Sequence, residues 1–387
     1  MNRHYRVGGA AFALVTAAVL VASGCSSSSS QSSADSPASA ASSASAASTS
    51  SSGTSDSAAV TAAEALVRKY SAVQPNITVA PLKSKPPTGK TVAVIACPYP
   101  SCAVLANGVV GGAEKLGWSS KIYDEPATLE GYIATWNQVL QATPNFIVYF
   151  AGLPNSIISA QLAKAAQLKI PAVAIGSTEA PNDVMRATIG GSATSVLTGQ
   201  LMGASIVADA KGAATTAFVW DPTTSLAFGP LKNSFTQEVT AAGGTVNVLG
   251  VSSAEVGKDI PGQVVSYLQT HPSVKYMAFA PAVFLAGVPE ALKVAGITDV
   301  KIVSYAPSTS DLAAIKSGTE WVSVATENEI AGYRTVDTLA RIAEGMPFDA
   351  NPAGLQQILT ASNVTGSLEP ATQGSPVDAF LAAWHVG

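Results

Sequence analysis

The chain has 387 residues, of which 47% are hydrophobic and only 12% are charged, and its formal net charge is −4. This length allows two or three domains, because a single hydrophobic core stops growing at roughly 250–300 residues. So little charge, with a mean hydropathy of +0.29, is typical of a membrane protein or of an exported protein rich in Ala, Ser and Thr. No basic stripe runs through the sequence, so we expect no nucleic-acid partner.

The first 24 residues have the order of an export signal. A basic segment with Arg3 and Arg6 precedes an uncharged stretch, residues 7–24, that ends in small residues before Cys25. This order predicts a signal peptide over residues 1–24. The Ala-Ser-Gly-Cys sequence resembles a bacterial lipobox, although Ala22 stands where Leu is commonest, and the resemblance implies a lipid on Cys25 that anchors the protein outside the cell. The alternative is an uncleaved anchor helix, which would be barely long enough to span a bilayer.

The segment after Cys25 is predicted to be a tether. Residues 26–57 contain 18 serines among 32 residues and, apart from Pro37, no apolar side chain larger than alanine. Such a segment cannot bury enough apolar surface to offset the entropy of ordering, so we predict a disordered Ser/Ala-rich tether over residues 25–57. Loss of the signal also removes Arg3 and Arg6, which leaves 19 basic residues against 25 acidic ones and a net charge of −6.

After the export signal, the sequence contains no further candidate for a membrane-spanning helix. The longest uncharged window, residues 131–163, is interrupted by Asn, Gln and Pro, so no apolar run of about 20 residues survives.

The two remaining cysteines suit an oxidising compartment. Cys97 and Cys102 are separated by four residues that include two prolines, and a bend there would bring the thiols together. We therefore predict a disulfide, with two buried free thiols as the alternative. We expect no metal and no cofactor, because histidine ligands are scarce. The histidines are His4, His271 and His385.

From residue 91 onward, short apolar β-branched runs alternate with longer stretches of helical periodicity. In the first half, strands are predicted at 91–96, 121–123, 146–150 and 172–175, with helices at 103–116, 131–140 and 155–168. After a Gly-rich break at 188–192, strands are predicted at 215–220, 245–251, 274–279 and 301–304, with helices at 195–208, 226–241, 260–270 and 283–295. This order predicts an α/β fold of two doubly wound parallel-sheet lobes with a cleft between them.

Six stretches resemble the type 1 periplasmic binding proteins of the ribose-binding kind. They are 92–118 (VAVIACPYPSCAVLANGVVGGAEKLGW), 144–175 (PNFIVYFAGLPNSIISAQLAKAAQLKIPAVAI), 198–212 (TGQLMGASIVADAKG), 233–244 (NSFTQEVTAAGG), 271–296 (HPSVKYMAFAPAVFLAGVPEALKVAG) and 322–345 (VSVATENEIAGYRTVDTLARIAEG). The similarity covers roughly residues 91–348. It implies a three-strand hinge, with crossings near 188–192, near 324–327 and just after residue 345.

The residues before 91 predict their own elements, and the resemblance implies the boundaries of the two lobes. Residues 58–90 are expected to form a helix, at 62–70, and a Pro-rich connector. Lobe 1 is expected to comprise 91–188 and 325–346, and lobe 2 to comprise 189–324 and 347–387.

Aligned with that family, the chain keeps few of the polar residues that bind sugar hydroxyls. Leu231 falls where an Arg would sit, and Thr326 replaces a Gln. Each unpaired buried polar group costs roughly 1–3 kcal/mol, so the cleft favours a less hydroxylated, aromatic or lipid-like ligand over a typical sugar. For each aromatic residue an ordinary core position is the alternative. The predicted ligand-binding residues are Tyr99, Ser177, Trp220, Asp221, Phe228, Leu231, Phe284, Tyr305, Thr326 and Glu327.

Other functional classes fit the sequence less well. It has no phosphate loop and no Gly-x-Ser-x-Gly elbow, so we predict no catalytic residues and no enzyme activity. The carboxylates Asp124 and Glu125 are interpreted as a solvated loop or a cleft rim. The resemblance implies a monomeric solute receptor that feeds an ABC permease. A ligand sensor of the same fold that signals to a membrane receptor is the alternative, whereas a sugar-responsive repressor would need a DNA-binding headpiece where the tether lies.

Overall fold

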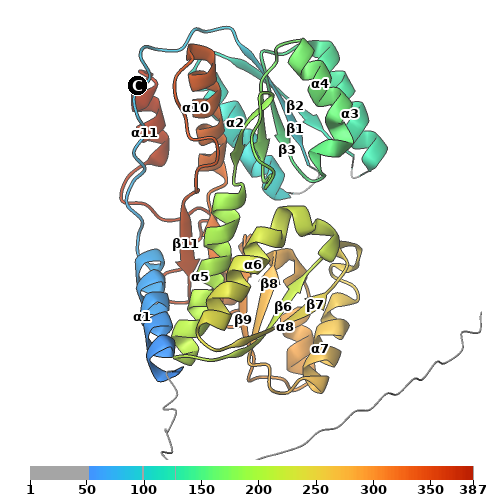
Figure 1. Cartoon of the computed structure of the whole chain (residues 1–387), viewed down its shortest axis with the longest axis vertical. Coiled ribbons are helices and arrows are strands. Elements are labelled where there is room, and N and C mark those ends of the chain that lie inside the picture. The colour runs from blue at the N-terminus through green and yellow to red at the C-terminus, as the bar shows by residue number, and fades with distance from the viewer. Residues whose placement is uncertain (1–51, 98–99, 127, 387) are drawn as a thin grey trace, which may run out of the picture. The chain divides into compact units, whose positions relative to one another are not determined.

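The structure, a computed structural model, describes residues 52–97, 100–126 and 128–386. Two lobes are each built on a largely parallel β-sheet with helices on both faces (Figure 1). The predicted α/β fold of two parallel-sheet lobes is therefore confirmed. The predicted signal peptide, Cys25 and the tether up to residue 51 lie outside the described residues. No helix in the described part of the chain is both long enough and apolar enough to span a membrane.

Lobe 1 contains a parallel sheet in the order β2-β1-β3-β4-β5. Its strands are β1 (Thr91–Ala96), β2 (Ser119–Asp124), β3 (Phe146–Phe150), β4 (Ala172–Ile175) and β5 (Met185–Ile189). The helices α2 (Pro100–Lys115), α10 (Glu329–Glu344) and α11 (Pro376–Ala383) cover one face, and α3 (Leu129–Ala142), η1 (Asn155–Ile158) and α4 (Ser159–Gln167) cover the other. Burial on both faces explains why β3 is apolar at all five positions.

Lobe 2 contains a sheet in the order β11-β10-β9-β8-β6-β7, in which only the edge strand β11 is antiparallel. Its strands are β6 (Thr215–Trp220), β7 (Thr245–Gly250), β8 (Tyr276–Ala280), β9 (Lys301–Tyr305), β10 (Val322–Thr326) and β11 (Gln356–Leu359). One face packs against α1 (Ser52–Ser71), α5 (Ser192–Ala210) and α6 (Ser225–Ala241). The other packs against α7 (Ile260–Thr270), η4 (Ala282–Leu285) and α8 (Val288–Val294), while α9 (Thr309–Ser317) covers β10 and β11. The short helices η2 (Pro222–Thr224) and η3 (Ser253–Glu255) follow β6 and β7.

Three segments form the hinge between the lobes. Residues 190–191 join β5 to α5, residues 327–328 join β10 to α10, and residues 345–355 join α10 to β11. These positions agree with the crossings expected from the sequence.

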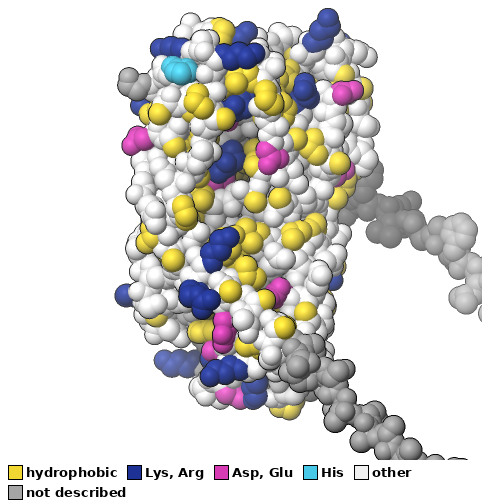
Figure 2. Space-filling model, turned by 60° about the vertical axis from the view of Figure 1, so that its left-hand side comes forward, with side chains coloured by type: hydrophobic (Ala, Val, Ile, Leu, Met, Phe, Trp, Pro, Cys, Tyr) yellow, Lys and Arg dark blue, Asp and Glu magenta, His cyan; other side chains and the backbone are white. Residues whose placement is uncertain are grey.

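Two further segments also pass between the lobes, which the sequence did not predict. Residues 72–90 lead from α1 on lobe 2 to β1 in lobe 1, and residues 360–375 lead from β11 to α11. They run side by side, because the Gln74 N–H donates to the Ala371 carbonyl at 2.8 Å and the Gln373 N–H donates to the Gln74 carbonyl at 2.9 Å. We call this pair of segments the strap. On the face that carries it, hydrophobic side chains form small groups among polar surface and Lys and Arg side chains (Figure 2).

The end of the chain corrects the expected lobe boundaries. Residues 347–387 were expected in lobe 2, but only β11 joins that sheet, and α11 packs on lobe 1. Trp384 is fully buried there, and its indole N–H donates to Asp337 Oδ1 at 2.9 Å. Asp337 in turn pairs with Arg341 at 2.7 Å, and Arg341 donates to the Ala80 carbonyl of the strap. The apolar side chains of α11 therefore pack against α10 in lobe 1.

Several predicted elements also have different bounds. The helix α1 begins at Ser52, so residues 52–57 are helical rather than part of a disordered tether. The helix expected at 283–295 is divided into η4 and α8, because Gly287 adopts a positive φ of 80° between them. The helix expected at 155–168 likewise begins with the separate turn η1. The strand β5 was not predicted, and it completes the sheet of lobe 1 beside β4.

Candidate ligand-binding site

The carboxyl ends of the parallel strands locate the candidate site. Open parallel sheets bind ligands beyond these ends, where the loops of neighbouring strands meet. In lobe 1 the residues directly after the strands include Cys97, Glu125 and Gly176, and in lobe 2 they include Asp221 and Glu327. The two lobes touch at this edge, because the Thr178 hydroxyl after β4 donates to the Leu226 carbonyl in the first turn of α6.

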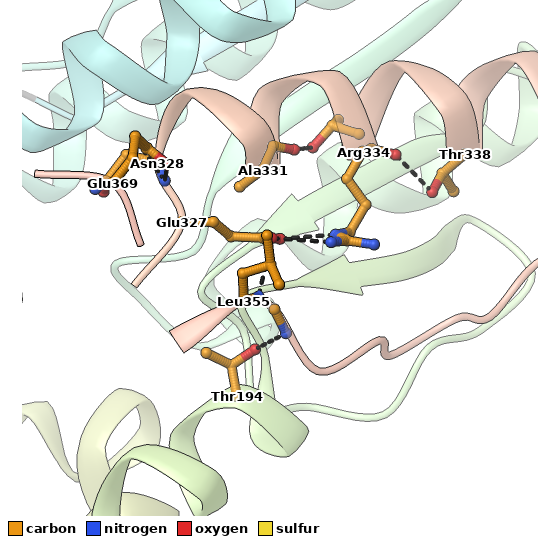
Figure 3. A network of polar contacts seen from close by, with 10 residues as sticks. Thr194, Glu327, Asn328, Ala331, Arg334, Thr338, Leu355 and Glu369 are labelled. Atoms are coloured by element: carbon orange, nitrogen blue, oxygen red, sulfur yellow. Dashed lines mark hydrogen bonds and ion pairs between the residues drawn. The ribbon is translucent and has the colours of Figure 1, made fainter. Parts of the chain in front are cut away.

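Glu327 lies in the hinge rather than free in the cleft. Its carboxylate forms a two-pronged ion pair with Arg334, at 2.7 Å from Nε and 2.9 Å from Nη2 (Figure 3). It also accepts the Leu355 N–H at 2.9 Å. Glu327 is only 7% exposed, and burial lowers the pKa of Arg334 while the Glu327 carboxylate raises it, with a net rise. The predicted ligand residue Glu327 therefore joins two hinge segments, with both of its oxygens occupied.

The same hinge is tied to the strap by Glu369. This carboxylate accepts the Asn328 N–H at 3.0 Å and the Glu329 N–H at 2.9 Å, and so caps the start of α10 (Figure 3). Burial raises the pKa of Glu369, and the nearby charges of Glu327 and Glu329 add to the rise against the effect of the two N–H groups. The hinge segment 327–328, between β10 and α10, is therefore bound by the other hinge contacts of Glu327 and by Glu369 of the strap.

Asp221 also has a positioning role in this structure. Its carboxylate accepts the backbone N–H and hydroxyl of Thr223 at 2.9 and 2.7 Å, and the same two groups of Ser253 at 2.8 and 2.7 Å. Burial alone would raise the pKa of Asp221, but these hydrogen bonds outweigh it and lower the pKa to about 2. Asp221 thus fixes the loops after β6 and β7.

An aromatic wall lies at the carboxyl edge of lobe 2. Trp220 ends β6 and is 7% exposed, and the rings of Phe228 and Tyr305 meet edge to face with centroids 6.0 Å apart. Burial raises the pKa of Tyr305, which stays neutral. Lys232 Nζ lies 5.4 Å from the centroid of the Trp220 ring. Thr326 is half-buried at the end of β10. Three of the predicted aromatic residues and Thr326 therefore lie at this edge, together with a lysine that sequence reasoning missed.

Two predicted residues belong to the core of lobe 2. Leu231 is 1% exposed and packs with α5 and β6, and Phe284 is 2% exposed and packs with α7 and α8. Both are core side chains in this structure. For Phe284 this is the alternative given for each aromatic residue, whereas Leu231 was expected in the cleft.

In lobe 1, the predicted residues lie near the hinge or at the loop after β1. Ser177 is 2% exposed, and its hydroxyl accepts the Glu179 N–H at 3.2 Å. A disulfide joins Cys97 to Cys102, whose Cα atoms are 5.8 Å apart, and it closes the loop between β1 and α2. The predicted ligand residue Tyr99 lies outside the described residues.

A buried polar group beside β2 was not assigned to the site from sequence. Within the described residues, Glu125 Oε2, the Tyr132 hydroxyl and the Trp136 indole N–H are buried without a hydrogen-bond partner. Burial raises the pKa of Glu125 to about 7. Burial raises the pKa of Tyr132, the neighbouring Trp136 side chain lowers it, and the charge of Glu125 adds a smaller rise. The position of Glu125 directly after β2 is the one sequence signal for this group.

The described residues offer little for catalysis. His271 is the exposed C-cap of α7 and stacks on Tyr267, and His385 Nε2 lies 2.8 Å from the Leu82 carbonyl of the strap. The Nδ1 of His271 lies 3.0 Å from the hydroxyl of its neighbour Thr270, at the end of α7 and not directly after a strand. No cluster of three or more metal-ligating side chains occurs in the described part of the chain. The arrangement suits binding of a small molecule.

Solved structures with the same fold are binding proteins. GanP, a glucose-galactose binding protein from Geobacillus stearothermophilus, is 18% identical with a TM-score of 0.64, and the match covers 72% of this chain and 99% of that one. A 5-methylthioribose transporter solute-binding protein from Thermotoga lettingae is 15% identical with a TM-score of 0.62, covering 73% and 89%. The XylFII-LytSN complex gives 18% identity and a TM-score of 0.62, covering 72% and 100%.

These similarities show that the chain has the type 1 periplasmic binding protein fold, as expected from the sequence. The names of these neighbours describe binding and transport rather than enzymes. No family model and no curated protein matches the chain.

Proposed function

We propose that this protein is an extracytoplasmic solute-binding protein that delivers a small molecule to an ABC importer by hinge closure of its two lobes. The observation that carries the proposal is the arrangement of the carboxyl edges, which meet at Thr178 and Leu226 beside a three-segment hinge. A ligand held by both edges would stabilise the closed form by as much as its affinity differs between the two states. The names of the structural neighbours support this class of function.

We further propose that a lipid on Cys25 anchors the protein to the outer face of the cell membrane. The basic, apolar and small-residue order of residues 1–25 supports this anchor. The disulfide between Cys97 and Cys102 is consistent with an oxidising compartment outside the cytoplasm.

The proposed ligand is apolar over much of its surface. The half-buried Phe228 and Tyr305 present aromatic area at the edge of lobe 2, beside the buried Trp220, whereas the carboxylate oxygens of Asp221 and Glu327 bind other groups of the protein. A sugar would leave several hydroxyls without a partner there, at roughly 1–3 kcal/mol each. An aromatic or lipid-like solute fits this wall better.

A ligand sensor that signals to a membrane receptor is the second candidate. The similarity to the XylFII-LytSN complex favours this alternative, because a protein of this fold occurs there in a complex. A pull-down from membranes with the ligand-loaded protein would separate the two, since the first predicts a permease and the second a receptor.

The experiment that tests the binding function is a thermal-shift screen of sugars, aromatic compounds and amphiphiles, followed by small-angle scattering with each stabilising compound. We expect at least one compound to raise Tm and to reduce the radius of gyration. Stabilisation without compaction would contradict hinge closure, and a strong response to a pentose or hexose would contradict the apolar ligand.

A further inference from the structure

We infer that the ligand of the proposed cleft carries a carboxylate, which Lys232 and the indole N–H of Trp220 bind in lobe 2. This inference rests on the proposed binding function and names the chemical class of its ligand.

The first observation is an unused donor. Trp220 is 7% exposed, and its Nε1–H has no hydrogen-bond partner among the described residues. An indole nitrogen can only donate, so a group that satisfies it must bring a lone pair. Leaving a buried donor unpaired costs about 1–3 kcal/mol, which an incoming acceptor would recover.

The second observation is a cation without an acid partner. Lys232 is half-buried, its ammonium lies 5.4 Å from the centroid of the Trp220 ring, and it forms no ion pair within the described residues. Side chains of a helix lean toward its N-terminus. Since α6 starts at the carboxyl edge of the sheet, Lys232 leans toward the cleft. The ammonium therefore lies beside the Trp220 side chain, which ends β6 at this edge of the sheet.

The surrounding groups favour an anionic acceptor with an apolar body. Glu238, the nearest acid in sequence, forms no ion pair with Lys232. Asp221, which directly follows Trp220, is saturated by four hydrogen bonds from Thr223 and Ser253, so it is not available to neutralise Lys232. Phe228 and Tyr305 add aromatic area beside these donors. A ligand cation would be repelled by Lys232, and a neutral hydroxyl would leave its charge unpaired. A carboxylate accepts from both donors at once.

Matched probes test this inference. Benzoate and octanoate are compared with benzamide, octanamide, benzylamine and D-ribose by thermal shift and calorimetry. We expect each carboxylate to bind at least tenfold more tightly than its amide, with an affinity that falls as salt is raised. Lys232→Met should abolish this preference and leave amide binding within about twofold, Lys232→Arg should retain it, and Trp220→Phe should weaken it severalfold.

Lys275→Met is the matched control, because Lys275 is an exposed lysine of lobe 2 already paired with Asp299. It should leave carboxylate binding unchanged. Three results would each overturn the inference without contradicting the binding function. The first is equal affinity for acid and amide, and the second is an unaltered preference in a folded Lys232→Met variant. The third is binding of ribose but of no carboxylate. A failure of every compound, sugars included, to bind would instead refute the proposed function itself.

Discussion

Glu320 should make the stability of lobe 2 depend on pH. The residue precedes β10 and is 1% exposed. Its Oε1 accepts the hydroxyl of Ser304, which lies 2.6 Å from that of Ser323, and its Oε2 has no partner among the described residues. Burial raises the pKa of Glu320 from 4.5 to about 8, with a smaller contribution from the charge of Asp311, while the bond from Ser304 opposes the rise. Folded Glu320 is therefore protonated at neutral pH.

The sign of the effect follows from proton binding. Between pH 4.5 and about 8 the unfolded chain carries an ionised Glu320 and the folded chain a protonated one. The folded state then binds one more proton, so its contribution to the free energy of unfolding falls by ~1.4 kcal/mol for each pH unit of this window. The contribution is most favourable below the window and is lost as pH rises through it. Between about pH 5 and pH 8 the loss amounts to roughly 3 kcal/mol.

Glu320→Gln removes this titration and keeps the shape of the side chain. The variant and the parent chain can differ in free energy of unfolding at pH 5 for other reasons. Between about pH 5 and pH 8, we expect this difference to shift by roughly 3 kcal/mol in favour of the variant. Urea unfolding followed by tryptophan fluorescence, repeated across this range, measures the difference. Glu290→Gln on the exposed side of α8 is the control, with a difference that should stay flat. A flat difference for Glu320→Gln would refute the assignment of a protonated buried carboxyl.

Three further predictions concern the hinge, the disulfide and the anchor. Arg334→Leu leaves the 7%-exposed Glu327 without its ion pair, so urea unfolding should show a loss of about 3–5 kcal/mol. Lys275→Leu, in an exposed pair, should cost under about 1 kcal/mol, and equal losses for the two variants would contradict the hinge role. Mass spectrometry without reductant should find Cys97 linked to Cys102, and reduction should cost about 2 kcal/mol for so short a loop; alkylation of both thiols in the untreated protein would contradict the bond. Cys25→Ala, or inhibition of lipoprotein signal processing, should release the protein from membranes, whereas unchanged retention would favour an anchor helix.

The sequence predicted the sheets better than the connections between them. Runs such as residues 146–150 are apolar throughout, because both faces of a parallel sheet are buried, and they were placed correctly. The strand β5 was missed because the exposed Arg186 interrupts its apolar run. The assignment of α11 to lobe 1 depends on the contact of Trp384 with Asp337, which are 47 residues apart. Neither periodicity nor composition carries that information.

The sequence predicted which residues follow the strands of lobe 2, but it did not predict their hydrogen bonds and ion pairs. Trp220, Phe228 and Tyr305 lie at the carboxyl edge of lobe 2 because they follow or flank its strands. The engagement of Glu327 by Arg334 could not be predicted, since it depends on how the chain turns into α10. Lys232 was not predicted because the similarity to the family places its neighbour Leu231 in the cleft, whereas the Leu231 side chain is buried in the core and Lys232 lies over the Trp220 ring.

The strap connects both lobes to the point where a force on the N-terminal segment would act. Because α1 packs on lobe 2, a pull on the chain ahead of Ser52 would reach lobe 2 first. The strap passes part of this tension to lobe 1, through the Leu82 N–H bound to the Ala383 carbonyl at 2.9 Å and through Arg341 bound to Ala80. A force on the proposed tether would therefore be carried by contacts in both lobes.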